Sequence, residues 1–234
     1  MALAKWTPYL ESEMLGLADL VGPGSVCLDV GAAAGLYSFV LSHLAGPSGQ
    51  VHSIEPLQFA HPVWRRVLGI KGLANLTPYT LALDAEPRTG VMSVPFGRRV
   101  PVTGRSFLTG RSSGLGPNVE FVRHEEVPVA VDTMDALVSR VGLTRLDFIK
   151  IDVEGGELHV LQGGDNTIRE LRPALLVEIE ARHTARYQYS PADIVKWFTE
   201  RDYAMYTWHD SWRETSQVSL DQRNYLFRPR QPAG

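Results

Sequence analysis

Short apolar runs alternate along the chain with segments whose apolar residues recur at helical spacing. The first pattern predicts buried strands and the second predicts amphipathic helices. Glycine and proline clusters separate the segments, as at residues 22–24 and 46–49, and mark where elements end. The predicted strands are residues 26–30, 51–54, 76–83, 91–96, 119–131, 148–152, 174–180, 203–208 and 224–228, and the predicted helices are residues 7–20, 36–45, 57–70, 132–141, 191–200 and one that begins at 157–161.

Strands that alternate with helices are typical of a mostly parallel sheet with helices on both faces. We therefore expect an α/β fold with a doubly wound, mostly parallel sheet of seven strands. Only a polar loop separates the last two predicted strands, which indicates a hairpin and one antiparallel edge strand. The length of 234 residues suits a single domain over 1–234, with a helical segment within 1–24.

Composition and charge narrow the classes of function. The chain has 44% hydrophobic residues, 21% charged residues and a formal net charge of −3. This charge argues against a general nucleic-acid binder, which needs a basic surface. Cys27 is the only cysteine, so no disulfide forms within the chain, and its place in a strand predicts a core residue. The sequence shows no signal peptide and no apolar run of about 18 residues, so we expect a cytoplasmic protein without a membrane span.

The turn after the first predicted strand carries the first candidate chemistry. Asp29 is followed by Gly31, Ala33 and Gly35, whose small side chains let the backbone approach a ligand. Glu55 follows the second strand, where a carboxylate can accept both hydroxyl hydrogens of a ribose. The Gly-x-Gly-x-x-Gly spacing of dinucleotide-binding turns is absent, and Asp29 would repel a pyrophosphate. The pattern therefore favours the cationic S-adenosylmethionine (SAM) over a nicotinamide or flavin; a turn that only packs a helix stays open.

A second cluster lies in residues 148–157, at the end of another predicted strand. Asp152, Glu154 and Glu157 place three carboxylates within six residues, which is costly unless a cation is near. The cation could be a divalent metal ion, the sulfonium of SAM, or side chains such as Lys150. Glu178, on the next strand, is placed to pair with Lys150 or to join a metal site. A salt-bridge network that only stiffens the turn is the alternative.

These motifs resemble those of the FkbM-type methyltransferase family, which pairs an Asp-Val-Gly-Ala turn with a later Lys-Ile-Asp-Val-Glu-Gly-x-Glu segment. The matching segments are residues 29–35 and 150–157, with Glu55-Pro56 between them, and the resemblance spans roughly residues 25–182. The chain departs from the family at Ala33, where the family usually carries Asn. The resemblance implies the Rossmann-like class I fold of SAM-dependent methyltransferases. It also implies O-methylation of a sugar, a glycoside or a polyketide-type natural product.

The motifs and the resemblance assign roles to individual residues. A hydroxyl is a weak nucleophile, so a base or a metal ion must assist it. Residues 97–118, rich in glycine and arginine, are a candidate lid or acceptor-binding loop, or else a solvated loop. The site candidates are Asp29, Gly31, Ala33 and Gly35 around the methionine part of SAM, Glu55 at the ribose, Ala82 and Leu83 at the adenine, Asp152 beside the cofactor and also catalytic, Glu154 and His183 as further catalytic residues, and Asp152, Glu154 and Glu178 as ligands of a divalent cation such as Mg²⁺.

Other functions stay open beside the methyltransferase. One is a catalytically silent scaffold that retains the SAM pocket. Another is an RNA methyltransferase, which the net charge and the lack of an Asn/Asp-Pro-Pro-Tyr motif disfavour. A nicotinamide dehydrogenase would bind NAD in place of SAM. For the favoured enzyme, we expect a small-molecule or glycan hydroxyl acceptor as the partner, no nucleic acid, and a homo-oligomer.

Overall fold

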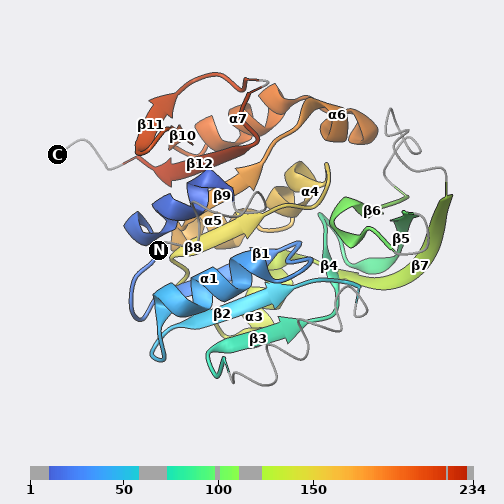
Figure 1. Cartoon of the computed structure of the whole chain (residues 1–234), viewed down its shortest axis with the longest axis horizontal. Coiled ribbons are helices and arrows are strands. Elements are labelled where there is room, and N and C mark those ends of the chain that lie inside the picture. The colour runs from blue at the N-terminus through green and yellow to red at the C-terminus, as the bar shows by residue number, and fades with distance from the viewer. Residues whose placement is uncertain (1–10, 58–72, 98–100, 111–122, 220, 231–234) are drawn as a thin grey trace.

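The computed structural model describes residues 11–57, 73–97, 101–110, 123–219 and 221–230. Its larger sheet has eight strands in the order β11-β10-β12-β9-β8-β1-β2-β3 (Figure 1). The strands from β9 to β3 in this order run parallel, whereas β12 is antiparallel to β9 and β10, and β11 is antiparallel to β10. Their bounds are β1 (Val26–Val30), β2 (Gln50–Ile54), β3 (Leu76–Tyr79), β8 (Phe148–Ile151), β9 (Ala174–Glu178), β10 (Tyr203–Trp208), β11 (Trp212–Thr215) and β12 (Asn224–Pro229).

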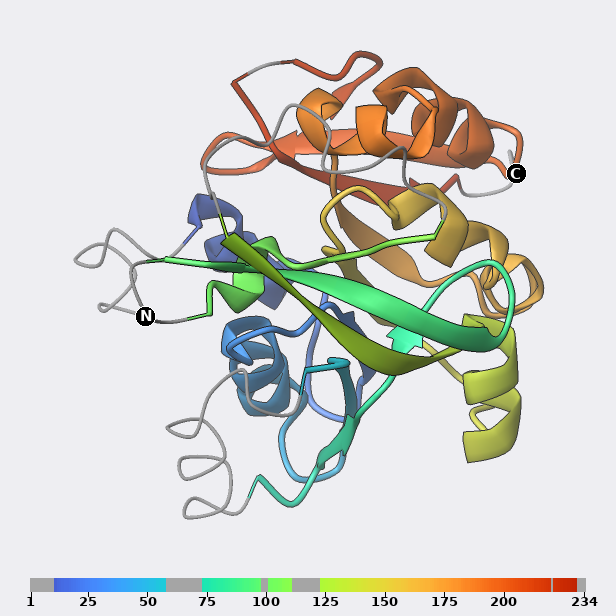
Figure 2. The ribbon, with the colours of Figure 1, turned by 90° about the vertical axis from the view of Figure 1, so that its right-hand side faces the viewer.

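A second sheet of four strands, in the order β4-β7-β5-β6, lies at the carboxyl ends of the parallel strands (Figure 1). Figure 2 looks onto this end and shows β5 and β7, in green, crossing in front of it. The strands are β4 (Ala82–Leu83), β5 (Arg88–Phe96), β6 (Phe107–Leu108) and β7 (Arg123–Asp132). Only β4 and β7 pair in parallel, while β5 pairs antiparallel with both β7 and β6. This sheet forms a wall over the end of the larger one.

The faces of the larger sheet bury different helices, because consecutive side chains of a strand point to opposite faces. Cys27, Phe148 and Leu176 pack with α1 and η2, whereas Leu28 and Ile149 pack with the helices of the other face. Burial raises the pKa of the Cys27 thiol to about 12, so it is an inert core residue, as predicted. No described helix has the length and apolar character needed to cross a membrane. The helices are η2 (Ser12–Asp19), α1 (Leu36–Ala45), η3 (Thr103–Arg105), α3 (Met134–Val141), α4 (Glu157–Gln162), α5 (Asp165–Leu171), α6 (Ala181–Thr184), η4 (Ala185–Tyr187) and α7 (Pro191–Thr199).

The predicted α/β class is confirmed, and three details of the sheet are wrong. The strand count is eight, not seven, because the polar segment between β10 and β12 contains β11. The antiparallel β12 lies inside the sheet, between β9 and β10, and not at its edge. The predicted strand 76–83 divides into β3 and β4, which belong to different sheets.

The predicted helices fare similarly. The N-terminal helix is present over Ser12–Asp19 as the 3₁₀ helix η2, and residues 7–10 of the prediction lie outside the described residues. α3 begins after Thr133, whose side chain caps the helix by accepting a hydrogen bond from the backbone N–H of Ala136. The predicted helix 57–70 lies outside the described residues apart from Leu57.

Candidate active site

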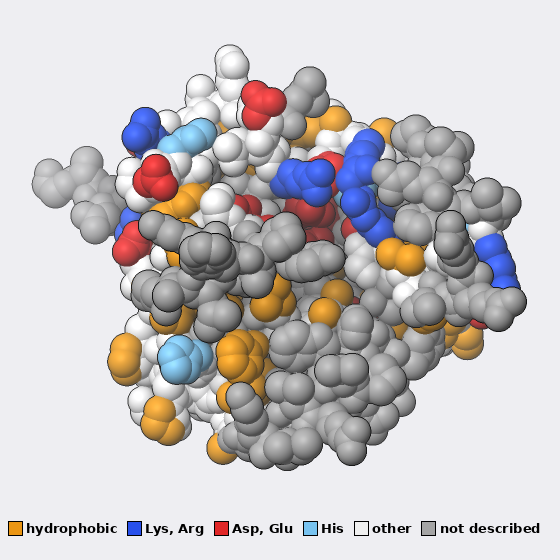
Figure 3. Space-filling view, in the orientation of Figure 1, with side chains coloured by type: hydrophobic (Ala, Val, Ile, Leu, Met, Phe, Trp, Pro, Cys, Tyr) orange, Lys and Arg blue, Asp and Glu red, His pale blue; other side chains and the backbone are white. Residues whose placement is uncertain are grey.

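A cavity opens where the carboxyl ends of the parallel strands meet the second sheet. It contains about 770 Å³ of empty space, open solvent at its mouth included. The loops after β1, β2 and β8 line one side, and β4, β5 and β6 line the other. On the face drawn in Figure 3, acidic side chains lie at the floor of a hollow, with lysine or arginine side chains beside them. This edge of an α/β sheet is where ligands ordinarily bind.

The loop after β1 is fixed against both neighbouring strands. The N–H groups of Gly31 and Ala32 both donate to the carbonyl oxygen of Ile54, at 3.0 Å each. Gly31 has a φ of 81°, and a Cβ atom there would lie 1.7 Å from the carbonyl oxygen of Asp152. No other residue type fits this position, because both the backbone angle and the space exclude a side chain. The turn predicted from the small residues is therefore present, and it lines the cavity.

Asp29 lies at the base of this loop and is 1% exposed. Its carboxylate accepts a hydrogen bond of 2.5 Å from the Ser38 hydroxyl, and burial raises its pKa to about 6. Asp29 lines a smaller cavity together with Tyr37 and Lys150. Gly31, Ala33 and Asp152 line both cavities, so the two adjoin. Asp29 therefore lines a cavity together with Gly31 and Ala33, two other residues predicted for the methionine part of SAM.

Glu55 lines the larger cavity. Its two carboxylate oxygens accept the N–H groups of Ala33 (2.9 Å) and Leu57 (2.8 Å), and burial raises its pKa to about 7. Each carboxylate oxygen has a second lone pair, which these bonds leave available for a ligand. Ala82 and Leu83 line the same cavity, in β4 of the opposite wall. The structure thus brings the residues predicted for the ribose and the adenine together.

Lys150 is a buried cation at the centre of the larger sheet. Its Nζ atom lies 2.7 Å from Oδ1 of Asn224 and 3.6 Å from Oδ2 of Asp152. Burial alone would lower the pKa of Lys150, but the carboxylates of Asp152 and Glu178 raise it above its ordinary value. Among the described residues, the ion pair is with Asp152, and the predicted partner Glu178 acts only through its field. Burial, reinforced by the neighbouring Asp152 carboxylate, raises the pKa of Glu178 well above its ordinary value.

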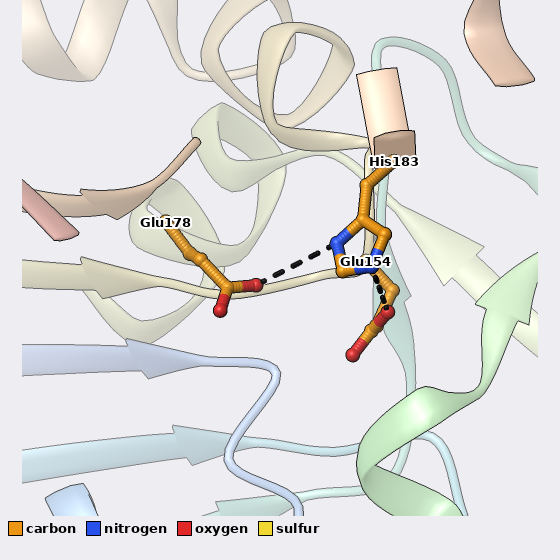
Figure 4. Close-up of side chains that lie close together, drawn as sticks. All are labelled: Glu154, Glu178 and His183. Carbon is orange, nitrogen blue, oxygen red and sulfur yellow. Dashed lines mark ion pairs between the residues drawn. The ribbon is translucent and has the colours of Figure 1, made fainter. Parts of the chain in front are cut away.

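His183 lies between Glu178 and Glu154 (Figure 4). Its Nε2 atom is 3.2 Å from Oε2 of Glu154, and its Nδ1 atom is 3.8 Å from Oε2 of Glu178. Burial lowers the pKa of His183 to about 4 and raises that of Glu154 to about 8, the latter with help from Asp152. His183 is 2% exposed and lies behind Glu154, which lines the cavity. The sequence expected His183 to face a substrate, and the structure buries it among the carboxylates.

The loop that presents Glu154 has an uncommon backbone. Glu154 has a φ of 57° and Gly155 a φ of 110°, and a Cβ atom on Gly155 would lie 2.4 Å from the carbonyl oxygen of His183. A left-handed φ in a non-glycine residue stores strain, which is found disproportionately at functional positions. The sequence gives the carboxylates of this loop but not their conformation.

Two further cavity residues were missed from the sequence. His159 follows the second motif on α4, and Tyr187 lies in η4. The Tyr187 hydroxyl donates to the carbonyl oxygen of Leu108 at 2.7 Å, which attaches β6 to the site. Of the candidate lid 97–118, Gly104, Ser106 and Leu108 line the cavity; residues 98–100 and 111–118 lie outside the described residues. The signal for His159 was its place two residues after the last motif carboxylate.

The chain was compared with known proteins. The family profile described as "Methyltransferase FkbM domain" matches residues 29–205. The chain belongs to the FkbM methyltransferase family. It is 25% identical over 169 residues to the AMB antimetabolite synthetase AmbE of Pseudomonas aeruginosa, an alignment covering 62% of this chain and 8% of that protein. The chain therefore spans less than a tenth of that relative.

Solved structures share the fold. The FkbM methyltransferase of Methylobacillus flagellatus superimposes with a TM-score of 0.52 at 18% identity, covering 88% of this chain and 43% of that one. SMU.1697c of Streptococcus mutans, assigned as a methyltransferase and solved with SAH bound, gives a TM-score of 0.52 at 10% identity, covering 95% and 98%. A Clostridium thermocellum protein assigned as an rRNA methylase gives 0.51 at 9% identity, covering 92% and 90%. The FkbM chain thus has the class I, SAM-binding methyltransferase fold.

Proposed function

We propose that this FkbM methyltransferase transfers the methyl group of SAM to a hydroxyl of a sugar, a glycoside or a polyketide-type natural product. One observation carries the proposal. Asp152 and Glu154 of the second motif line the same cavity as Gly31, Ala33 and Glu55 of the first. A site for a nucleoside cofactor therefore adjoins carboxylates that can take a proton from a hydroxyl.

The residues present fit SAM. The free lone pairs of Glu55 suit the two ribose hydroxyls, and the apolar side chains of Leu81 and Leu83 suit an adenine. Asp29 and Asp152 place negative charge on the smaller cavity, which suits the ammonium and sulfonium groups of the methionine part. Ala33 offers only its backbone, so the hydrogen bond that the family's Asn would add is absent from this chain.

When bound, SAM supplies an electrophilic methyl group for an in-line displacement by the acceptor oxygen. Asp152 is the proposed proton acceptor, because its side chain is 30% exposed, whereas Glu154 is 9% exposed. Lys150 holds the Asp152 carboxylate from behind. Glu154 is the second candidate, since burial brings its pKa to about 8, near the pH at which proton transfer must occur.

The remaining expectations belong to this proposal. The described part of the candidate acceptor-binding loop contributes to the acceptor side of the cavity, as the lining by Ser106 and Leu108 supports. A divalent cation assists the acceptor hydroxyl. The acceptor is a small molecule or glycan, not a nucleic acid, in line with a net charge of −3. A cytoplasmic location and a homo-oligomeric state are kept as expectations.

The proposal is tested by incubating the full chain with SAM and a panel of sugars, glycosides and polyketide-type alcohols. We expect S-adenosylhomocysteine (SAH) together with an acceptor that has gained one methyl group, located on oxygen by fragmentation. Binding of SAM without turnover on any acceptor would instead indicate a scaffold. Methylation of RNA alone would replace the acceptor class. Binding of NAD but not SAM would refute the cofactor.

A further inference from the structure

Three buried side chains of metal-ligating type meet beneath the cavity. Glu154 follows β8, Glu178 ends β9, and His183 lies in α6, so separate parts of the chain converge here (Figure 4). One ligand atom from each lies within 4.8 Å of those from the other two. Their exposed fractions are 7%, 7% and 2%. The fold thus gathers two carboxylates and an imidazole away from bulk solvent.

Within the part of the chain that the structure describes, two atoms in this group have no hydrogen-bond partner. Oε2 of Glu154 and Nε2 of His183 are both buried and unpartnered, although they lie 3.2 Å apart. The pair is close but not aligned as a donor and an acceptor. Burying such atoms unsatisfied is costly, so native proteins ordinarily give them a partner. A single ion that accepts a lone pair from each would satisfy both atoms at once.

We propose that Glu154, Glu178 and His183 bind a divalent first-row transition-metal cation, of which Zn²⁺ and Mn²⁺ are the probes. Metal–oxygen and metal–nitrogen bonds of about 2.0–2.2 Å place two ligands of one ion roughly 3–4 Å apart. The separation of 3.2 Å already meets this, and the 4.8 Å limit of the whole group requires only small side-chain rotations. An imidazole ligand favours such a cation over Mg²⁺ or Ca²⁺, which prefer oxygen.

This ligand set differs from the one expected from the sequence, because His183 replaces Asp152. Asp152 pairs with Lys150 and lines the cavity, and it is not one of the three side chains whose ligand atoms converge. Arg105 and Arg186 also act electrostatically on Glu154, which lowers the affinity for a cation without occupying Oε2.

The role of the cation rests on the proposed function. Glu154 lines the cavity, so an ion bound to it lies at the acceptor side of the site. A Lewis acid there polarises the acceptor hydroxyl and makes its proton easier to lose. The O–H bond breaks with its proton passing to Asp152, the oxygen bonds to the methyl carbon, and the carbon–sulfur bond breaks to release SAH.

Metal binding is tested on the full chain after exhaustive chelation and dialysis. Calorimetric titration with Mn²⁺, Zn²⁺ and Mg²⁺ is expected to show one site per chain, with Mg²⁺ weakest. His183→Gln and Glu178→Gln should each weaken Mn²⁺ binding by at least about 10-fold, since even outer-shell partners are worth that much. His209→Gln and Glu170→Gln, at exposed positions, are the matched controls and should leave the affinity unchanged.

A second measurement needs no variant. Pulsed electron paramagnetic resonance of Mn²⁺ on the wild-type protein should show coupling to a ¹⁴N nucleus, the signature of an imidazole ligand. No stoichiometric binding, no nitrogen coupling, or equal affinity in the variants and controls would overturn the proposal. SAH binding and methyl transfer by the chelated protein are measured in parallel. Methyl transfer by a protein that binds no metal would refute the proposed cation and leave the methyltransferase function standing. Metal binding by a protein that does not bind SAM would refute the proposed function and leave the metal site standing.

Discussion

Glu157 tests how burial changes the pKa of a carboxyl group in the second motif, residues 150–157. It is the first residue of α4, is 1% exposed, and accepts the N–H groups of Gly155 (2.9 Å) and Val153 (3.2 Å). Both bonds go to one oxygen, Oε1. The near-isosteric change Glu157→Gln keeps a carbonyl oxygen for them and removes the ionisable proton. Its effect on stability should therefore depend on pH.

The magnitude follows from the pKa of Glu157, which burial raises from 4.5 to about 7 despite the two backbone bonds. Below pH 4.5 the side chain is neutral in both the folded and the unfolded chain, so its ionisation contributes nothing. Between pH 4.5 and pH 7 the folded state holds the proton of Glu157 more tightly than the unfolded state, so the free energy of unfolding falls as the pH rises. Above pH 7 the full cost is reached, which at about 1.4 kcal/mol per pH unit is about 3 kcal/mol.

The assay is urea unfolding of both proteins between pH 4.5 and pH 8, with linear extrapolation to water. The free energy of unfolding of Glu157→Gln, minus that of wild type, should increase by about 3 kcal/mol across this range. Glu170→Gln, at an exposed position of α5, is the control and should differ from wild type by no more than about 0.5 kcal/mol at each pH. Parallel pH profiles for wild type and Glu157→Gln would refute the reasoning.

Three more changes probe the first loop and the proton acceptor. Gly31→Ala places a Cβ atom 1.7 Å from the backbone of Asp152 and should lower the free energy of unfolding by more than about 4 kcal/mol; a normal urea midpoint would contradict this. Ala33→Gly should raise the free energy of unfolding by about 0.5 kcal/mol, because Ala33 has a φ of 42°, which glycine adopts without strain. A lower urea midpoint for this variant would contradict the prediction. Asp152→Asn should reduce kcat at saturating SAM by about 10²–10⁴-fold, measured as SAH release, and an unchanged kcat would exclude it as the base.

The parts of the fold set by local pattern could be predicted from the sequence. β1, β2 and β8 are short segments in which apolar residues surround a few polar ones, and they are buried on both faces, as is typical of parallel strands. Asp29, Glu55 and Asp152 then meet because parallel strands place their carboxyl ends at one edge. Predicting this convergence requires only that the strands are parallel and that their order in the sheet is known.

The second sheet could not be predicted in the same way. β4 has two residues and β6 has two, too short for any periodicity, and the leucine and alanine of β4 read as the end of β3. β11, Trp212–Thr215, is half exposed and polar, so nothing in its composition separates it from a loop. The position of β12 inside the sheet depends on the register of its pairing with Leu175 and Glu178, which no local signal encodes.

The convergence of Glu154, Glu178 and His183 has the same origin. Glu178 ends a strand beside β8, but His183 reaches the group only because α6 turns back over the loop that carries Glu154 and Gly155. Gly155 permits this contact, since a side chain there would meet the carbonyl oxygen of His183 at 2.4 Å. The same loop holds Glu154 in a left-handed conformation that aims its carboxylate between the cavity and the imidazole. Gly155→Ala should therefore displace α6 and move His183 away from Glu154 and Glu178, even though it changes no ligating residue.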